Sequence, residues 1–281
     1  MSLTRRSIGG GLRYPILLWR IRELWDKLLL VSGCAGLLLV YSGWSRARLA
    51  EWAVYVAAVL FLLIGGYAIN NVGDFEQDLL SGKKAVKPTP PRSHSLGSGM
   101  AAIAIGVWLI VKATQGALPL AIAAATVFLG VEYSLPPMRF KEKGIWGIVV
   151  GALTQRPMIF LIWAAALGAW NTYTLVLACW LFSGGMAGML GHQVLDQDFD
   201  RTGRVQSCVL QKGVRFARRL GTACAIVLAL ATLAPFAVMP GPQALYHVAA
   251  LAAMLSVYAG KVLKLWWQIR RLNPLPPAGL R

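Results

Sequence analysis

Acidic residues in this chain gather in two short windows. Six of its eleven Asp and Glu residues lie there: Asp74, Glu76 and Asp78 in the first, and Asp196, Asp198 and Asp200 in the second. Within each window the outer two aspartates are four residues apart, so on a helix they stack on one face, where like charges repel. We expect a chain this poor in acids to crowd them only around a cation. Oxygen ligands of this kind suit Mg²⁺, which takes one or two carboxylates and completes its shell with water and substrate phosphate.

Each window has a neighbour that extends the same helical face. Asn70 lies four residues before Asp74 and offers an amide oxygen as a third donor. His192 lies four residues before Asp196 and has two interpretations, a base at the site or an interfacial histidine hydrogen-bonded to its neighbours. A solvated, charged helix end would explain one such window. The repetition of the pattern favours a metal site.

A third polar segment, with the sequence YSLPPMRFK from Tyr133 to Lys141, lies between the two windows. Its double proline is expected to end the preceding helix and to fix an extended turn. Arg139 and Lys141 are then presented at the membrane face where the acids lie. A topological anchor would explain their charge, but it would not require a rigid turn. We therefore expect these two cations to help hold an anionic ligand of the metal.

The elements that position these residues are membrane helices. Of the 281 residues, 57% are hydrophobic and only 14% are charged, far from the composition of soluble proteins. A spanning helix needs about 20 predominantly apolar residues, and eight candidate segments occur, at 28–44, 52–69, 96–111, 117–133, 145–169, 173–191, 220–239 and 243–263. The expected fold is an all-α polytopic bundle forming a single domain over 1–281, with a basic amphipathic lead-in at 1–27 and a polar tail at 264–281.

The basic residues predict the orientation of the bundle. If the amino terminus is cytoplasmic, three long polar loops at 70–95, 134–144 and 194–219 face the cytoplasm with most of the Lys and Arg, whereas the other side keeps only Arg46, Arg48 and Lys112. Both acidic windows then lie at the cytoplasmic face. The net charge of +17 is explained by this asymmetry and by attraction to anionic lipid headgroups, so no nucleic-acid partner is expected.

The four cysteines show no metal or redox spacing, and no disulfide is expected.

Taken together, the three motifs resemble those of the UbiA superfamily of intramembrane prenyltransferases. The family shows NDxxDxxxD after its second helix, a YSxPPxRxK-like segment after its fourth and DxxxD after its sixth. Here NNVGDFEQD, YSLPPMRFK and DQDFD stand in the same order and on the same helices, and the resemblance covers about residues 15–260. Two departures are visible: Asn71 replaces the usual first aspartate, and eight helices are found where the family has nine.

The resemblance implies a Mg²⁺-dependent transfer of an isoprenoid group from its diphosphate to an aromatic or quinone-precursor acceptor in the bilayer. Two Mg²⁺ ions are expected, with Mn²⁺ as a substitute. The implied catalytic residues are Asp74, Asp78, Asp196 and Asp200, and the implied metal ligands are these four together with Asn70. The implied diphosphate-binding cations are Lys83, Lys84, Arg139, Lys141 and Arg201. The candidate substrate pocket comprises Tyr67, Tyr133, Arg156, Trp163, Phe182 and His192.

Physical arguments also apply to two kinds of pocket candidate, the aromatic residues and Arg156. Aromatic faces can stabilise an allylic cation, although aromatic side chains in membrane helices are more often packing residues. Arg156 falls inside or near the start of an apolar segment, directly before Pro157. An arginine inside a membrane is functional by default, whereas an arginine at the start of a helix is merely interfacial.

Three functions fit the sequence to different degrees. The first is the prenyltransferase. The second is a terpene cyclase on the same fold, which acts on an isoprenoid diphosphate without an external acceptor. The third is a channel or divalent-cation transporter, which would place its acids at the middle of the membrane rather than at helix ends beside basic loops. The sequence separates the third from the first two, and it does not separate transferase from cyclase.

Overall fold

The computed structural model describes residues 21–82 and 91–256, and these residues form helices with no strand. The all-α fold expected from the sequence is therefore confirmed. The elements are α2 (Ile21–Tyr41), α3 (Arg46–Leu80), α5 (Arg92–Ala113), α6 (Ala117–Ser134), the short 3₁₀ helix η1 (Phe140–Glu142), α7 (Ile145–Gln155), α8 (Pro157–Ala166), α9 (Thr172–Leu195), α10 (Gln197–Thr202), α11 (Cys208–Leu233), α12 (Pro235–Val238) and a further helix over 242–256.

Seven segments of the described chain are long and apolar enough to cross a membrane, and all seven correspond to expected spans. The chain is thus an integral, multi-pass membrane protein. The eighth expected span, 243–263, is helical as far as 256 and then leaves the described residues. Residues 21–27 of the expected lead-in form the first turns of α2, and the tail at 264–281 lies outside the described part.

The cytoplasmic loops expected at 70–95 and 194–219 are in large part helical, which corrects that expectation. Helix α3 continues to Leu80, well past the end of its apolar stretch. At 1.5 Å per residue, its 35 residues are about 50 Å long, against a bilayer core of about 30 Å. Helix α11 begins at Cys208 and is kinked at Gly213, where φ is 82°. The polar residues therefore lie on rigid extensions of the helices.

The expected span at 145–169 is interrupted, so it forms two helices, α7 and α8. Arg156 has non-helical backbone angles between them, and Pro157 is the first residue of α8. Proline has no N–H and clashes with the preceding turn, so the helix breaks at this point. Thr154 and Gln155, the last residues of α7, are consequently placed at a helix end inside the bundle.

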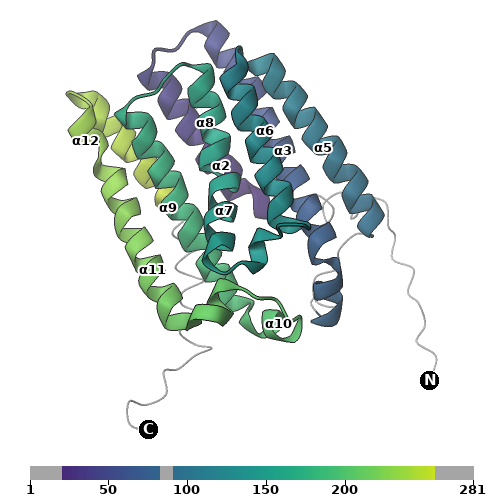
Figure 1. The fold of residues 1–281 in the computed structure, drawn as a ribbon. Helices are drawn as coiled ribbons and strands as arrows, with labels where there is room; N and C mark the ends of the chain where they lie inside the picture. The colour runs from purple at the N-terminus through teal and green to yellow at the C-terminus, as the bar shows by residue number, and fades with distance from the viewer. Residues whose placement is uncertain (1–20, 83–90, 257–281) are drawn as a thin grey trace, which may run out of the picture.

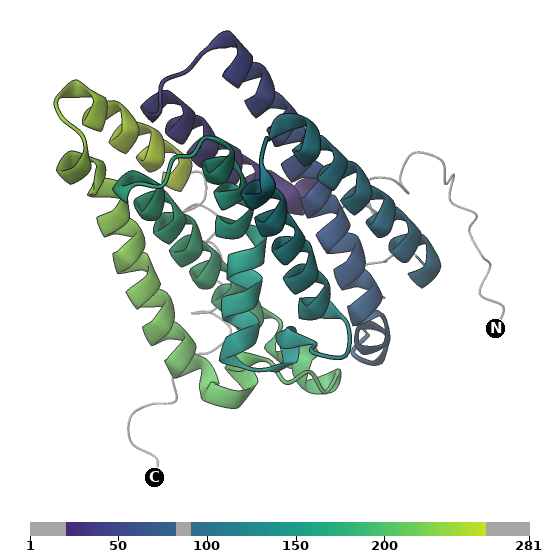
Figure 2. The same cartoon turned by 45° about the horizontal axis from the view of Figure 1, so that its top comes forward.

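The helices form an elongated bundle in which α3 packs along α5 and α9 packs along α11, with α6, α7 and α8 between these pairs (Figure 1). Turning the bundle shows the same neighbours (Figure 2). The main core is built from fully buried aromatic and aliphatic side chains, including Tyr55, Trp163 and Trp180. A second core around Ile148 and Leu190 joins α7 to α9 at the end of the bundle that carries α10.

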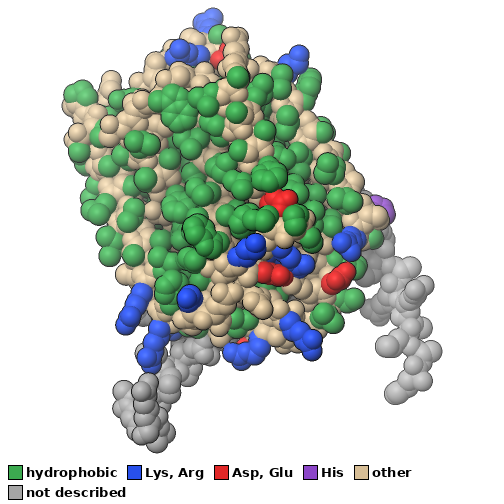
Figure 3. Space-filling model, viewed as in Figure 1, with side chains coloured by type: hydrophobic (Ala, Val, Ile, Leu, Met, Phe, Trp, Pro, Cys, Tyr) green, Lys and Arg blue, Asp and Glu red, His purple; other side chains and the backbone are tan. Residues whose placement is uncertain are grey.

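The surface agrees with a bilayer environment. Large apolar side chains such as Trp108, Phe128 and Leu230 are more than half exposed on the flanks. Figure 3 shows apolar side chains over the middle of one face and most Lys and Arg toward its two ends. Burying such a belt in lipid removes its apolar area from water.

Candidate active site

The first acidic window lies at the end of α3 and is held there by α6. Asn70, Asp74 and Asp78 follow one another at a spacing of four on this helix. The Asn70 side-chain amide donates to Asp74 Oδ2 at 2.6 Å, and the Ser134 hydroxyl donates to Asn70 Oδ1 at 3.0 Å. Asn70 thus fixes the Asp74 carboxylate relative to α6.

The YSLPPMRFK segment is fastened against the same helix end. Lys141 is only 7% exposed and forms an ion pair and hydrogen bond with Asp74 Oδ1. Arg139 donates to the Gly73 carbonyl at 3.0 Å and pairs with Glu142 at 2.8 Å, and Gln77 donates to Glu142 at 2.5 Å. Both predicted diphosphate-binding cations of the segment therefore contact α3, Lys141 through a carboxylate and Arg139 through the backbone.

The second acidic window follows α9, which ends at Leu195. Asp196 caps this helix and accepts a hydrogen bond from the Asp200 backbone N–H at 2.8 Å, so the spacing of four is kept into α10. Both aspartates are partly buried, whereas Asp198 is exposed. Asp198 thus differs in exposure from the two aspartates that share a helical face.

The two acidic helix ends adjoin. A Cβ at Gly203, which follows α10, would lie 3.2 Å from the Gln77 carbonyl oxygen of α3. The Tyr133 hydroxyl of α6 lies within Coulombic reach of both Asp74 and Asp200. Residues that are far apart in sequence therefore meet at one end of the bundle, with the segment between Tyr133 and Lys141 beside them.

The donor set at this end fits magnesium bound with a phosphate ligand. No three His, Cys, Asp or Glu side chains in residues 21–82 and 91–256 converge closely enough to hold a metal by themselves. Magnesium does not need such a cage, because it is usually held by one or two carboxylates together with water and substrate phosphates. Two carboxylate pairs on adjoining helix ends meet that requirement, and all their donors are oxygen.

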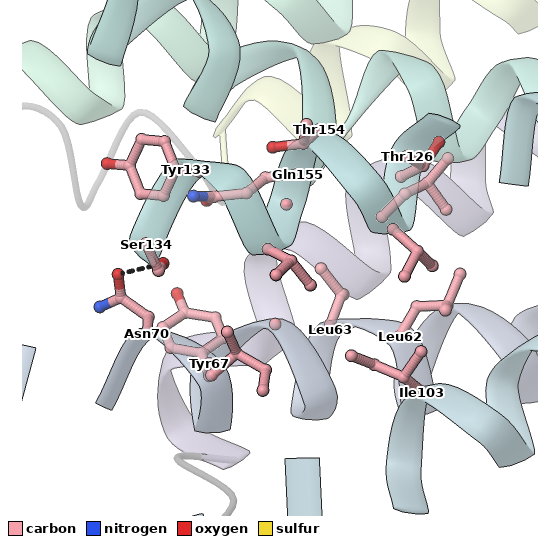
Figure 4. A pocket seen from close by; sticks show the side chains of 16 residues that line it. Leu62, Leu63, Tyr67, Asn70, Ile103, Thr126, Tyr133, Ser134, Thr154 and Gln155 are labelled. Atoms are coloured by element: carbon pink, nitrogen blue, oxygen red, sulfur yellow. Dashed lines mark hydrogen bonds between the residues drawn. The ribbon is translucent and has the colours of Figure 1, made fainter. Parts of the chain in front are cut away.

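A cavity of about 160 Å³ opens beside Asn70, between α3, α5, α6 and the break between α7 and α8. Its end near the acids is polar, lined by Asn70, Ser134, Tyr67, Tyr133 and Gln155. Leu62, Leu63, Ile103 and Thr126 lie at the far end (Figure 4). A mainly apolar cavity with a few convergent polar groups at its mouth is the usual form of a small-molecule site.

The cavity contains two of the six residues predicted for the substrate pocket, Tyr67 and Tyr133. The other four, Arg156, Trp163, Phe182 and His192, do not line it. Trp163 is fully buried and stacks on Tyr55 with ring centroids 5.1 Å apart. Phe182 packs against the second core, and the His192 side chain is exposed at the end of α9.

Arg156 is buried and paired. It is 4% exposed, and its guanidinium lies 3.6 Å from the Asp26 carboxylate of α2. The next residue of α2, Lys27, donates to the Tyr67 hydroxyl and lies 4.7 Å from the centre of its ring. The second turn of α2 thus contacts the cavity wall through Tyr67 and the break between α7 and α8 through Arg156. Asp26, Thr154 and Gln155 were not among the predicted site residues, although the unusual position of Arg156 pointed to this region.

Arg201 is the remaining predicted cation within the described residues. Arg201 is exposed on α10, and Lys83 and Lys84 lie outside the described residues.

Asn71, the departure from the expected motif, is 3% exposed, and its side-chain amide has no hydrogen-bond partner within the described part of the chain. It lies off the face that carries Asn70, Asp74 and Asp78, so the substitution leaves that face intact.

Comparisons with known proteins agree with this geometry. The profile of the UbiA prenyltransferase family matches residues 29–274. A solved UbiA homologue from Archaeoglobus fulgidus bound to GPP and Mg²⁺ is 15% identical, with a TM-score of 0.65 over 88% of this chain and 86% of that chain. A structure of digeranylgeranylglyceryl phosphate synthase is 17% identical, with a TM-score of 0.61 over 92% of this chain and 94% of that one. No curated protein sequence matches.

Proposed function

Because the chain belongs to the UbiA prenyltransferase family, we propose that it is a Mg²⁺-dependent intramembrane prenyltransferase that moves an isoprenoid group from its diphosphate to an aromatic or quinone-precursor acceptor. The observation that carries the proposal is the meeting of two acidic helix ends at the polar mouth of an apolar cavity. The Archaeoglobus fulgidus homologue has been solved with GPP and with DMAPP, each together with Mg²⁺, which supports the same ligands here.

The two ends of such a substrate need different environments. Asp74 and Asp78 on one side, and Asp196 and Asp200 on the other, would hold the metal, with the Asn70 amide oxygen as a further donor. Bound Mg²⁺ supplies Lewis-acid stabilisation of the diphosphate leaving group. The hydrocarbon chain would lie in the cavity beyond Asn70, away from water.

Fixed cations beside the acids would assist the departure of the diphosphate. Lys141 is buried next to Asp74, so it is already placed where negative charge arrives, and preorganised charge of this kind stabilises a leaving anion strongly. Arg201, Lys83 and Lys84 are proposed as further contacts to the diphosphate. Arg139, bonded to the Gly73 carbonyl, is proposed to hold the turn and to reach the diphosphate with its remaining donors.

The transfer itself breaks the allylic carbon–oxygen bond, and its electron pair leaves with the diphosphate. A carbon of the acceptor then bonds to the allylic carbon, and the acceptor loses a proton. The rings of Tyr67 and Tyr133 at the cavity mouth can stabilise the positive charge that develops between these events. The apolar walls keep water from capturing the cation.

The decisive measurement is product analysis on purified, detergent-solubilised protein with geranyl diphosphate, Mg²⁺ and a set of phenolic and quinone-precursor acceptors. We expect a prenylated acceptor and diphosphate, no turnover in excess EDTA, and recovery when Mg²⁺ is added back. A hydrocarbon or terpene alcohol formed without acceptor would assign the site to a cyclase instead. Full turnover by metal-free protein would exclude both.

The acidic residues provide matched variants for the same assay. Asp74→Asn, Asp78→Asn, Asp196→Asn and Asp200→Asn should each reduce turnover by at least about 100-fold, because each removes a charge that the metal and diphosphate need. Glu76→Gln and Asp198→Asn are the controls, since both side chains are exposed and lie off the shared faces. Near wild-type turnover in any two of the four variants would contradict the proposed metal site.

A further inference from the structure

The cavity between α3 and α6 is built from two matching rows of residues. Leu62, Gly66 and Asn70 line it from α3 at a spacing of four, and Thr126, Gly130 and Ser134 line it from α6 at the same spacing. The Ser134–Asn70 hydrogen bond fixes the level at which the helices meet. Both helices run in the same direction, because α5, which comes between them in the sequence, runs back the other way (Figure 1). Counting back from this bond therefore places Gly66 level with Gly130, and Leu62 level with Thr126.

Gly66 and Gly130 do not lie at a close contact between helices, unlike other glycines of this bundle. A Cβ at Gly65 or Gly106 would lie within about 3 Å of side-chain atoms across the α3–α5 contact, whereas a Cβ at Gly66 or Gly130 would meet nothing within 4 Å. Glycine inside a helix costs about 1 kcal/mol relative to alanine, and helix packing does not explain that cost here. The space that these two residues leave open belongs to the cavity.

The dimensions of the cavity limit what it can hold. Leu62 lies two helical turns from Asn70, about 12 Å along α3, and each isoprene unit extends a chain by four carbon–carbon bonds, about 5 Å. The volume is about 160 Å³, and an apolar cavity of about 150 Å³ is known to hold benzene, which has six carbons. The volume matches about one five-carbon unit, whereas the length from the mouth to Leu62, along the side that the exposed Gly66 leaves open, matches about two units.

The side chains at the far end of the cavity leave little room for a longer hydrocarbon chain. Leu62 is only 7% exposed. The Ile103 side chain of α5 already lies against α3, 2.5 Å from the position a Gly65 Cβ would occupy, so it has no room to withdraw in that direction. A third isoprene unit would have to displace one of these two side chains.

We propose that this site selects isoprenoid diphosphates of one or two isoprene units, and that Gly66, Gly130 and Leu62 set this limit. The inference rests on the proposed function, since the cavity is taken to hold the hydrocarbon chain of that substrate. Gly66 and Gly130 supply the width beside the first unit, and Leu62 ends the cavity after the second.

The test measures binding, so it does not depend on knowing the acceptor. The ligands are S-thiolodiphosphates, in which sulfur replaces the bridging oxygen and slows ionisation, with chains of one to four isoprene units. Titration calorimetry on the full-length protein with Mg²⁺ should give similar Kd values for one and two units. Affinity should then fall by at least about tenfold at three and four units, a range typical of misfit in an apolar pocket. Inorganic diphosphate reports on the metal site alone.

Three variants test the residues. Gly66→Leu and Gly130→Leu should each weaken binding of the two-unit ligand by at least about tenfold and leave inorganic diphosphate binding unchanged, whereas Gly97→Leu, at an exposed and equally open position of α5, should change neither. Leu62→Ala should improve binding of the three-unit ligand relative to the two-unit ligand. Leu177→Ala removes an equally large buried side chain away from the cavity and should not alter that ratio.

The outcomes separate this inference from the proposed function. Equal affinity for two and four units, or unchanged two-unit binding in Gly130→Leu, would overturn the length limit while inorganic diphosphate still binds with Mg²⁺. The wild-type ligand series decides the length limit even where a leucine variant fails to fold. If neither inorganic diphosphate nor any chain binds in Mg²⁺, the proposed function itself fails.

Discussion

At the scale of single residues, the pair between Lys141 and Asp74 is the most informative contact. A lysine 7% exposed beside a carboxylate balances a charge that would otherwise be poorly solvated, since a buried charge is tolerated only when it is paired. In the proposed reaction, Asp74 would help to hold Mg²⁺, and the Lys141 ammonium would then be available to the diphosphate. Lys141 would thus have two roles, as the partner of Asp74 and as a contact to the diphosphate.

This dual role predicts the behaviour of Lys141 variants. Lys141→Ala should lower kcat/KM for geranyl diphosphate by about 100-fold, the usual effect of removing one preorganised donor. Lys141→Arg should recover part of the loss, because it keeps the charge and changes the donor geometry. Steady-state kinetics would decide, with Lys143→Ala as the control because Lys143 is an exposed neighbour. Unaltered kcat and KM in Lys141→Ala would reduce Lys141 to a structural counter-ion.

The candidate site shows what sequence reasoning can reach at this scale. Asp74 and Asp78, like Asp196 and Asp200, follow from a spacing of four on a helix, so their shared faces were predictable. The partner of Lys141 was not, because it depends on how the turn after Pro137 folds back on α3. Nor was the pairing of Arg156 with Asp26, since nothing near either residue in sequence indicates that the start of α2 meets the helix break.

At the scale of elements, the break between α7 and α8 organises one wall of the cavity. Interrupted helices within membrane bundles are tolerated where they line a cavity, and Thr154 and Gln155 line this one. Arg156 joins the break to α2 through Asp26. The pair therefore ties the position of the cavity wall to a helix that is distant in sequence.

A double-mutant cycle tests this connection. Arg156→Leu alone should destabilise the protein by up to about 3–5 kcal/mol, because the mostly buried Asp26 carboxylate loses this cation. Asp26→Leu combined with Arg156→Leu should cost clearly less than the two single changes added together, since neighbours that share a partner are not additive. Chemical unfolding in detergent micelles measures both quantities. Strict additivity would show that the two side chains do not interact.

The contact between α3 and α6 gives a second prediction for elements. A Cβ at Gly73 would lie 2.4 Å from the Ser134 carbonyl oxygen, a backbone atom that cannot turn aside, so Gly73→Ala should push α3 from α6 and displace Asp74. We expect a lower Tm and a loss of turnover of at least about tenfold. Gly97→Ala is the matched change, because a Cβ there meets nothing within 4 Å, and its higher helix propensity should keep or raise Tm. Full activity in Gly73→Ala would contradict the close contact.

At the scale of the whole molecule, the sequence predicted the bundle well and its ends less well. Apolar length identifies spans because a bilayer sets that length, and seven of the expected segments are membrane-capable helices. The helical extensions of α3 and α11 escaped prediction because polar residues beyond the apolar core carry no such signal. The extension of α3 carries Asp74 and Asp78, so a part of the fold that apolar length does not predict holds one half of the candidate site.

The charge distribution of the whole bundle predicts its orientation in the membrane. In the described residues, the end that carries the acidic windows also holds Arg92, Arg139, Lys141, Lys143, Arg201, Arg204, Lys212, Arg215, Arg218 and Arg219, against Arg46, Arg48 and Lys112 at the other end. Such an excess marks the cytoplasmic side. The acids and the diphosphate would then meet in the cytoplasm, where Mg²⁺ and soluble diphosphates are supplied.

Single-cysteine labelling measures this directly. In a variant without the four native cysteines, Glu76→Cys lies beside the acidic end and Ser45→Cys precedes α3 at the opposite end. A membrane-impermeant maleimide should label Ser45→Cys in right-side-out vesicles and Glu76→Cys only in inverted ones, because each thiol is exposed on one side alone. Labelling after detergent lysis controls for reactivity, and retained turnover confirms that the cysteine-free protein is folded. The reverse pattern would place the catalytic end outside, where the basic residues would oppose the usual rule of insertion.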